Sequence, residues 1–298
     1  MVEVIVPATS ANIGPGFDVL GLSIDLYNRF RVEETDGGLE IKVPQDTGLS
    51  TGEKNLIFIS AKRLFDEVGY RYSGLRIEIE NNVPLGRGLG SSSTAIVGGL
   101  VAANEIAGSK LSKEEIFSLA TQIEGHPDNV GPAVFGGFTI CYGIGNGFKA
   151  VSYKPSEKLK PVLLIPDSIL ETKKARRVLP EEVPLADAVF NIARSSLLVS
   201  ALLTGKSDIL KYAMEDRLHQ PYRASLVPGL TDIIEDIAGI EGAGIALSGA
   251  GPSLICIIDR SIEQAFYDNV KRLLKDRGQN YMVHLAEFDL EGTKIISG

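Results

Sequence analysis

The stretch Pro84-Leu-Gly-Arg-Gly-Leu-Gly-Ser-Ser-Ser-Thr94 carries three glycines at alternate positions, followed by three serines. The alternating segment Gly74–Glu80 before it predicts a strand, and the run Ala95–Ile106 after it predicts a helix. Glycine lets the backbone come close to a ligand, and free N–H groups at a helix start attract anions. The order of strand, glycine-rich turn and helix therefore predicts a nucleotide phosphate loop. A solvated loop with a serine N-cap is the alternative.

Two better-known phosphate motifs do not match. The glycines follow the spacing G-x-G-x-G, whereas the dinucleotide fingerprint requires G-x-G-x-x-G. Gly205-Lys206-Ser207 resembles the end of a P-loop, but Ser200 stands where that motif begins with glycine. Gly205 is more simply interpreted as the C-cap of the preceding helix.

Composition limits the class of protein. A chain of 298 residues suggests two domains or one large one, and its 44% hydrophobic content supports a packed core. The net charge of −8 argues against a nucleic-acid binder. The N-terminus lacks a basic leader, and no apolar run approaches the ~20 residues that span a membrane. Cys141 and Cys256 lie in apolar runs, which predicts buried free thiols and a reducing, cytoplasmic setting.

Asn12 and Asp18 belong to the segment Pro7–Asp18, which is crowded with turn formers and predicts a loop after a strand over Val2–Val6. Apolar residues flank Asp18, so we expect its carboxylate to be at least partly buried. A buried carboxylate needs a partner, either a cationic ligand group or a structural arginine.

A second polar cluster, Glu124-Gly-His-Pro-Asp-Asn129, follows a helix whose start is marked by the capping box Ser112-Lys-Glu-Glu115. Helix C-termini prefer cations, so Glu124 is poorly placed for stability unless a cation binds there. Carboxylates and an imidazole beside tight turns are typical of functional sites. A polar turn, with Asp128 and Asn129 bonding their own backbone, is the alternative.

The polar segment Lys149–Lys160 predicts a linker, so we expect domains over 1–155 and 156–298. The second half predicts the order β, several α, β, β, α, β, which is typical of an α+β fold. The turn Ser248–Ser253 in this half consists of small residues, which leave the backbone accessible, as a close approach to substrate requires. The basic run Glu171–Arg177 is either an anion site or a solvated face.

Periodicity predicts the remaining elements. Helices are expected over Leu56–Val68, Leu185–Leu203, Ser207–Met214, Leu230–Ile237 and Ile262–Lys275, and strands over Leu26–Val32, Leu39–Val43, Val162–Ile165 and Tyr281–Ala286.

Three of these segments, Pro7–Asp18, Pro84–Ser93 and Leu247–Ser253, resemble in order and spacing the signatures of the GHMP small-molecule kinases. The resemblance covers essentially the whole chain. It implies an N-terminal domain like the second domain of ribosomal protein S5 and a ferredoxin-like C-terminal domain. It also implies ATP, Mg²⁺ and transfer of the γ-phosphoryl group to a small alcohol. The first segment, the 124–129 cluster and the stretch Thr172–Arg176 most resemble members that phosphorylate the side-chain hydroxyl of L-homoserine.

Roles carried over from the resemblance are as follows. The nucleotide would contact Asn55, Pro84, Leu85, Gly86, Arg87, Gly88, Leu89, Gly90, Ser91, Ser92 and Ser93. Homoserine would contact Asn12, Asp18, His126, Arg176, Arg223, Ser248, Gly249 and Gly251. The reaction centre would hold Asp128, Asn129 and Thr172. Mg²⁺ takes oxygen ligands, and Ser92, with Ser91 as the alternative, and Glu124 could supply them.

Several alternatives stay open at this stage. Asp128 could act as a general base, or the alcohol could attack directly while Asn129 orients it, because residues 7–18 contain no lysine to assist. Another alcohol such as mevalonate or shikimate is possible, although Asp18 favours a substrate with an ammonium group. A catalytically dead, small-molecule-binding regulator is a further alternative. A homodimer is common among such enzymes.

Overall fold

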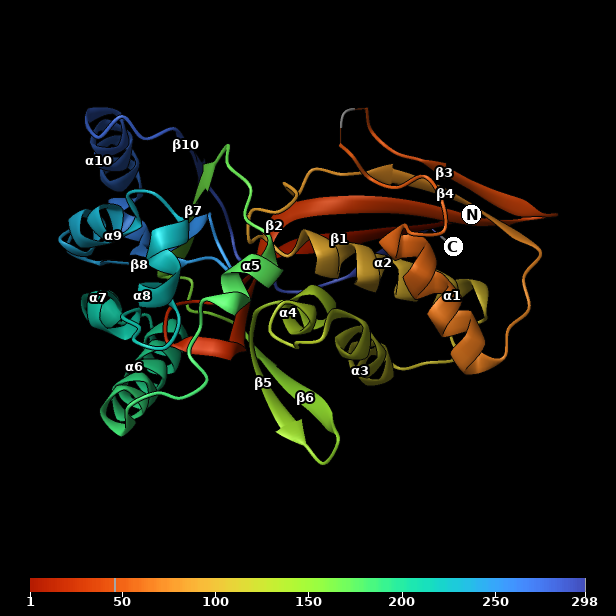
Figure 1. The fold of residues 1–298 in the computed structure, drawn as a ribbon, viewed down its shortest axis with the longest axis horizontal. Helices are drawn as coiled ribbons and strands as arrows, with labels where there is room; N and C mark the ends of the chain where they lie inside the picture. Colours follow the sequence, from red (N-terminus) through yellow and green to blue (C-terminus); the bar gives the residue numbers. More distant parts are fainter. Residues whose placement is uncertain (46, 298) are drawn as a thin grey trace.

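The computed structural model describes residues 1–45 and 47–297, which form two sheets with helices packed on them (Figure 1). The first sheet has the order β11-β1-β2-β4-β3, and β5 and β6 extend it from β2. Its strands are β1 (Val2–Asn12), β2 (Gly16–Thr35), β3 (Gly38–Lys42), β4 (Gly74–Glu80), β5 (Phe138–Ile144), β6 (Gly147–Tyr153) and β11 (Lys294–Ser297). β3 and β4 run parallel, whereas β1 and β2 form a long antiparallel pair.

Helices α1 (Leu56–Val68), α2 (Ser91–Ile106), α3 (Lys113–Glu124) and α4 (Val130–Phe135) lie on one face of this sheet (Figure 1). α2 is central, because it packs against α1, α3, β1 and β2. Its small residues permit the close approach: a Cβ at Gly98 would overlap the buried ring of Phe30 on β2. The start of α2 is therefore fixed against the sheet.

The second sheet has the order β10-β7-β9-β8. Its strands are β7 (Leu159–Pro166), β8 (Ala243–Leu247), β9 (Leu254–Asp259) and β10 (Tyr281–Leu285). The helices of this half are α5 (Thr172–Arg177), α6 (Leu185–Thr204), α7 (Leu210–Ala213), α8 (Gln220–Arg223), α9 (Leu230–Ala238) and α10 (Glu263–Asp276), with short 3₁₀ turns η1 (Ser207–Ile209), η2 (Ala224–Leu226) and η3 (Arg260–Ile262).

Both faces of the second sheet are buried, which explains its uninterrupted apolar strands. Leu254 and Cys256 of β9 face the core formed with α9 and α10. Ile255 and Ile257 face the opposite way, into a core that also contains Leu22 of β2. This second core joins the two halves of the molecule.

Several elements confirm the sequence predictions. α1 and β4 have the predicted bounds, and α6 differs by one residue from its predicted end. Ser112 and Glu115 form the capping box, and Gly205 caps α6 in the left-handed conformation. Both cysteines are free and buried, and burial raises the pKa of Cys141 to about 12.

Other predictions were wrong. Pro7–Asp18 is mostly strand, because β1 continues to Asn12 and pairs with β2 up to a tight turn. Lys149–Lys160 is not simply a linker, because residues 147–153 form β6, which pairs with β5 along its whole length. The predicted boundary near residue 155 lies between β6 and β7, and it stays a prediction.

The strand β11 was missed, and it returns the end of the chain to the first sheet beside β1. Asp289 secures this return, because its buried carboxylate accepts hydrogen bonds from Tyr27 Oη at 2.8 Å and the Gly292 N–H at 2.7 Å. Local pattern gave no sign of this pairing, since the partner strand lies almost 290 residues away in the sequence.

By length and composition alone, α6 could cross a membrane; among the described residues it is the one helix for which this holds. The sequence analysis expected no apolar run of this length. The helix also makes polar contacts with its own half, because buried Asn191 donates to Asp216 at 2.7 Å and Arg194 donates to Glu215 at 2.7 Å.

Candidate active site

The glycine-rich stretch ends at Gly90, which is the N-cap of α2. Ser91, Ser92 and Ser93 therefore form the first helical turn, whereas the sequence analysis began this helix at Ala95. Their backbone N–H groups have no carbonyl one turn earlier to bond, so they are available to an anion. The first turn also lacks an acidic side chain that would compete for this position.

Only glycine fits at two positions of this loop. Gly88 and Gly90 have φ of 74° and 69°, in the left-handed region. A Cβ at Gly88 would overlap the carbonyl oxygen of Ser248, and a Cβ at Gly90 would overlap Oγ1 of Thr9. The loop is thus held between strand β1 and the turn of the second half.

The turn after β8 holds the loop through its backbone. Ser248 Oγ lies 2.7 Å from the carbonyl oxygen of Gly88, and the Ser253 N–H donates to the carbonyl of Arg87 at 3.3 Å. Ser248 is completely buried, so it braces the loop and does not face the cavity described next. Gly251 also packs against Gly88 from outside that cavity.

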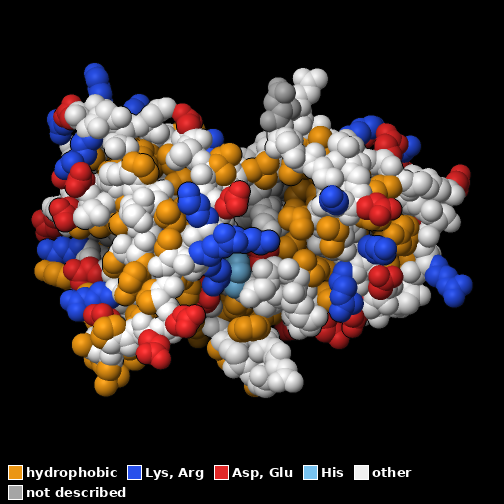
Figure 2. All heavy atoms as spheres, in the orientation of Figure 1, with side chains coloured by type: hydrophobic (Ala, Val, Ile, Leu, Met, Phe, Trp, Pro, Cys, Tyr) orange, Lys and Arg blue, Asp and Glu red, His pale blue; other side chains and the backbone are white. Residues whose placement is uncertain are grey.

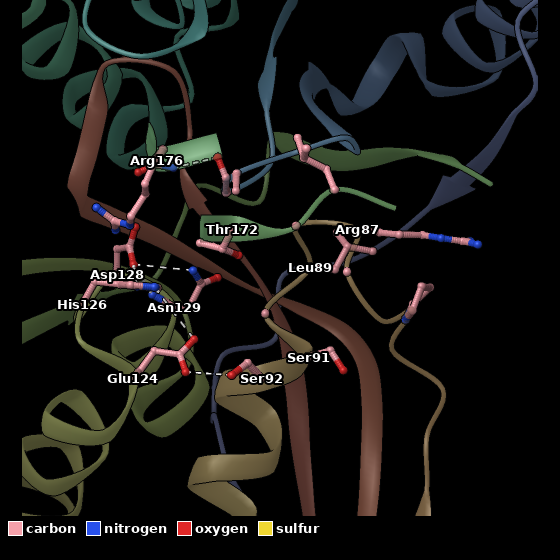
Figure 3. A pocket seen from close by; sticks show the side chains of 18 of the residues that line it. Arg87, Leu89, Ser91, Ser92, Glu124, His126, Asp128, Asn129, Thr172 and Arg176 are labelled. Atoms are coloured by element: carbon pink, nitrogen blue, oxygen red, sulfur yellow. Dashed lines mark hydrogen bonds and ion pairs between the residues drawn. The ribbon is translucent and has the colours of Figure 1, made fainter. Parts of the chain in front are cut away.

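A polar cavity of about 130 Å³ opens where the loop, the 124–129 cluster and α5 meet (Figure 3). Of the predicted site residues, those that line it are Asn12, Pro84, Gly86, Arg87, Gly88, Leu89, Gly90, Ser91, Ser92, Glu124, His126, Asp128, Asn129, Thr172, Arg176, Arg223 and Gly249. Those outside its lining are Asp18, Asn55, Leu85, Ser93, Ser248 and Gly251. Figure 2 shows Lys and Arg side chains gathered at the middle of the same face, between the two halves.

A second cavity of about 270 Å³ adjoins the first, since Gly86, Ser91 and Ser92 line both. Its walls are mainly apolar and include Phe30 and Ile57. Asn55 and Leu85 belong to this second cavity. Asn55 also caps α1, because its Oδ1 accepts from the Ile57 N–H at 3.0 Å. Most of these walls were missed, because they come from separate strands, helices and a loop.

Glu124 ends α3 and faces the serines of α2 (Figure 3). Its carboxylate accepts hydrogen bonds from Ser92 Oγ at 2.8 Å and from Ser93 Oγ at 3.0 Å. Ser91 Oγ is buried and has no hydrogen-bond partner among the described residues. The described residues contain no group of three or more acidic, His or Cys side chains that could hold a metal ion unaided. Any cation here would take further ligands from a bound molecule.

His126, Asp128 and Asn129 form one connected group. His126 Nδ1 lies 2.8 Å from Asp128 Oδ1, which also accepts the backbone N–H of Asn129 at 2.9 Å. Burial alone would lower the pKa of His126, but the hydrogen bond and the charges of Asp128 and Glu124 outweigh it and raise this pKa. Asn129 Oδ1 accepts from Thr9 Oγ1 at 2.8 Å. Thr9 was missed, although it lies in the first segment singled out in the sequence.

Asp18 and Arg176 form a bidentate ion pair, with Nη2–Oδ1 at 2.7 Å and Nη1–Oδ2 at 3.0 Å. The structure thus supplies the arginine partner that the sequence analysis considered for Asp18. Asn12 braces this segment, because its Oδ1 accepts the Asp18 N–H and its Nδ2 donates to the Gly249 carbonyl. Phe17, which the sequence analysis did not select, lies beneath the guanidinium of Arg176.

Replacing Gly90 with alanine is expected to destabilise the protein by about 1–3 kcal/mol more than replacing Gly108. Both glycines have positive φ, so both variants carry similar backbone strain. Only at Gly90 would the new Cβ overlap Thr9, whereas no described atom lies within 4 Å of a Cβ at Gly108. Urea unfolding measures the difference, and equal losses for the two variants would contradict the tight packing of the loop.

Comparison with known proteins identifies the family. Residues 55–137 match the family model "GHMP kinases N terminal domain", and residues 198–276 match "GHMP kinases C terminal". A homoserine kinase of Clostridium botulinum (strain Okra / Type B1) is 44% identical over 99% of this chain and 98% of the relative. The crystal structure of homoserine kinase from Cytophaga hutchinsonii has a TM-score of 0.88 at 30% identity and covers 99% of this chain and 97% of that one.

Fold and sequence therefore agree. The chain has the two-domain GHMP kinase fold and belongs to the homoserine kinases of the GHMP kinase family.

Proposed function

We propose that the enzyme transfers the γ-phosphoryl group of ATP to the side-chain hydroxyl of L-homoserine, giving O-phospho-L-homoserine. One observation carries the proposal: a mainly apolar cavity and a polar cavity meet at Gly86, Ser91 and Ser92. A nucleotide has an apolar base and charged phosphates, so it matches this pair of cavities. The polar cavity then receives the second substrate at the phosphate end.

The nucleotide would place its base in the cavity that includes Asn55 and Leu85, and its phosphates against the glycine-rich loop. The N–H groups of Ser91, Ser92 and Ser93 would bind phosphate oxygens, aided by the dipole of α2. Arg87 contributes its backbone, because its side chain points away from the cluster around Glu124 (Figure 3) and donates to the Asp167 carbonyl at 3.1 Å.

Ser92 and Glu124 would hold Mg²⁺ together with phosphate oxygens. Both side chains carry the oxygen donors that Mg²⁺ prefers. Ser91 Oγ has no hydrogen-bond partner among the described residues, but its side chain points away from Glu124 (Figure 3). When bound, Mg²⁺ would neutralise negative charge on the transferring phosphate. This role also accounts for a carboxylate at the C-terminus of a helix.

Homoserine carries an ammonium and a carboxylate on one carbon atom, which suits the paired Asp18 and Arg176. We propose that its ammonium binds Asp18 and Asn12, and that Arg176 and Arg223 take its carboxylate in bidentate fashion. His126 would line the same pocket. The turn of Ser248, Gly249 and Gly251 would close it by holding the loop in place.

We propose direct attack by the hydroxyl, with Asn129 orienting it and Thr172 beside it. One carboxylate oxygen of Asp128, Oδ1, already binds the His126 ring and the Asn129 N–H, so only Oδ2 could accept the proton. The hydroxyl proton would then leave late, after the bond to phosphorus has formed. Asp128 would instead raise the pKa of His126 through its hydrogen bond and its charge.

We also infer a cytoplasmic enzyme of threonine biosynthesis that acts as a homodimer, with domains over 1–155 and 156–298. Buried free thiols support the reducing compartment. Symmetric dimers are the commonest oligomers of soluble enzymes.

A panel of alcohols tests the substrate assignment. We expect L-homoserine to be phosphorylated with a kcat/KM about 10²-fold or more above that of mevalonate or shikimate, because these lack an ammonium for Asp18. An ADP-release assay with and without Mg²⁺ measures the ratio. Turnover of mevalonate without turnover of homoserine would refute the assignment, and nucleotide binding without any phosphorylated product would favour the regulator.

Replacing Glu124 with glutamine tests the metal site. We expect the Mg²⁺ concentration for half-maximal activity to rise by about tenfold or more, because a charged oxygen ligand is lost. Glu114→Gln is the matched control, since Glu114 is an exposed acid on the same helix. An unchanged Mg²⁺ dependence in Glu124→Gln would exclude this assignment.

Replacing Asp128 with asparagine distinguishes the two mechanisms. Direct attack predicts a kcat lowered by less than about tenfold, whereas losing a general base costs 10²–10⁴-fold. The variant should also lower the pKa of His126, because Asp128 raises it in the folded protein. An NMR titration of the His126 ring should therefore show proton loss at lower pH than in the wild type. A kcat loss above about 10²-fold would make Asp128 the base.

A further inference from the structure

His219 lies just before α8 and is completely buried, outside the lining of both cavities. One ring nitrogen, Nε2, lies 2.7 Å from the carbonyl oxygen of Gly14. The other, Nδ1, lies 3.1 Å from Nη1 of Arg223, which lines the polar cavity. We propose that His219 is a positioning residue that aims Arg223 at the substrate carboxylate without neutralising its charge.

The two partners fix the state of the ring. A carbonyl can only accept a hydrogen bond, so Nε2 carries the proton facing Gly14. A guanidinium can only donate, so Nδ1 must present a lone pair to Arg223. Only the neutral tautomer that carries its proton on Nε2 satisfies both contacts.

The charges around the ring agree with this state. Burial lowers the pKa of His219, and the charge of Arg223 lowers it further, whereas Asp216 and Asp18 act in the opposite direction. Asp216 lies 3.6 Å from Nε2, but its oxygens accept the N–H groups of His219 and Gln220 and the amide of Asn191. The carboxylate is thus bound to other donors.

Arg223 is held by neutral acceptors. Its Nε donates to the Ala175 carbonyl at 3.2 Å, and Nη1 donates to His219 and to the Gly249 carbonyl at 3.2 Å. Within the described part of the chain, no carboxylate lies within 4.0 Å of Arg223, whereas Arg176 is paired with Asp18. Burial and the charge of Arg176 lower the pKa of Arg223 to about 10, so it remains cationic at neutral pH.

Arg176 is paired with a carboxylate and Arg223 is not, and this difference explains why a neutral imidazole suits position 219. A carboxylate at position 219 would also orient the guanidinium, but it would form an ion pair and weaken the attraction for an anionic ligand. A neutral acceptor fixes the direction of Arg223 and leaves its positive charge for the cavity. Arg223 is therefore a cation in this cavity that a substrate carboxylate can bind without displacing a protein carboxylate.

The same ring also fixes the segment that carries Asp18. His219 stacks on Phe17 with ring centroids 5.3 Å apart, and it bonds Gly14, whose φ of 79° brings the chain against Met214. One imidazole thus holds Asp18 and Arg223 at a defined separation. These are the groups proposed for the two ends of the amino acid.

Steady-state kinetics test this inference, which rests on the proposed function. His219→Phe keeps a ring against Phe17 but removes both hydrogen bonds. We expect the KM for L-homoserine to rise about tenfold or more while the KM for ATP stays within about twofold. His219→Gln, which keeps an N–H and a carbonyl, should recover most of the loss. A wild-type enzyme without homoserine turnover would refute the proposed function, whereas an active wild type and an unchanged KM in His219→Phe would overturn this inference alone.

Gln220→Leu is the matched control. Gln220 follows His219 directly as the first residue of α8, and it is buried. Its Oε1 accepts the Leu247 N–H at 2.7 Å, away from the polar cavity. This variant should lower the thermal midpoint without changing either KM. If Gln220→Leu raised the homoserine KM as much as His219→Phe does, both variants would act only by loosening α8. That result would overturn the inference.

A double variant shows whether His219 acts through Arg223. In an Arg223→Lys background, His219→Phe should raise the homoserine KM no further, whereas a full additional tenfold rise would contradict the inference. If His219→Phe does not fold, NMR of the His219 ring in the wild type replaces it. The inference requires the neutral tautomer with the proton on Nε2 at about pH 7, and a protonated ring or the opposite tautomer would overturn it.

Discussion

The glycine-rich loop packs backbone against backbone between the two halves of the molecule, and the remaining site depends on this contact. Gly88 meets the turn after β8, while Gly90 meets Thr9 of β1, and neither position has room for a side chain. The contact sets the distance between the first turn of α2, from the first half, and Arg176 and Arg223, from the second. The cavity that we propose as the reaction site therefore lies where the halves meet, and residues of both halves line it.

Charge is distributed unequally within that space. Arg176 is paired with Asp18, whereas Arg223 is held by carbonyl oxygens and a neutral imidazole. Glu124 binds hydroxyl groups, and Asp128 binds a histidine whose pKa it raises. Each carboxylate thus has a partner, and the positive potential is left where phosphate and carboxylate groups would arrive. This local concentration of positive charge is compatible with the binding of anionic ligand groups by a protein with a net charge of −8.

Elements with strong local periodicity were predicted well. α1 and β4 match their predicted bounds, because apolar spacing and the Asn55 cap act over a few residues. Segments that depend on distant partners were predicted poorly. Pro7–Asp18 has the composition of a loop, but its small residues form a strand because β2 and the second half bury them on both sides. β6 and β11 exist because β5 and β1 offer free edges for pairing.

The sequence by itself determined the glycine-rich loop before α2, the polar cluster at the end of α3 and the family resemblance, because glycine spacing, capping residues and breakers act locally. It also determined which side chains are chemically suited to the site. Only the tertiary structure decided that Asp18 pairs with Arg176, that Ser93 and Ser248 brace the site from behind, and that His219 aims Arg223. Asp18 and Arg176 are 158 positions apart, and Ser248 and Gly88 are 160 apart, and no local pattern encodes such distances. His219 and Arg223 are only four positions apart, but their role depends on the burial of both and on Gly14 and Gly249 from distant segments.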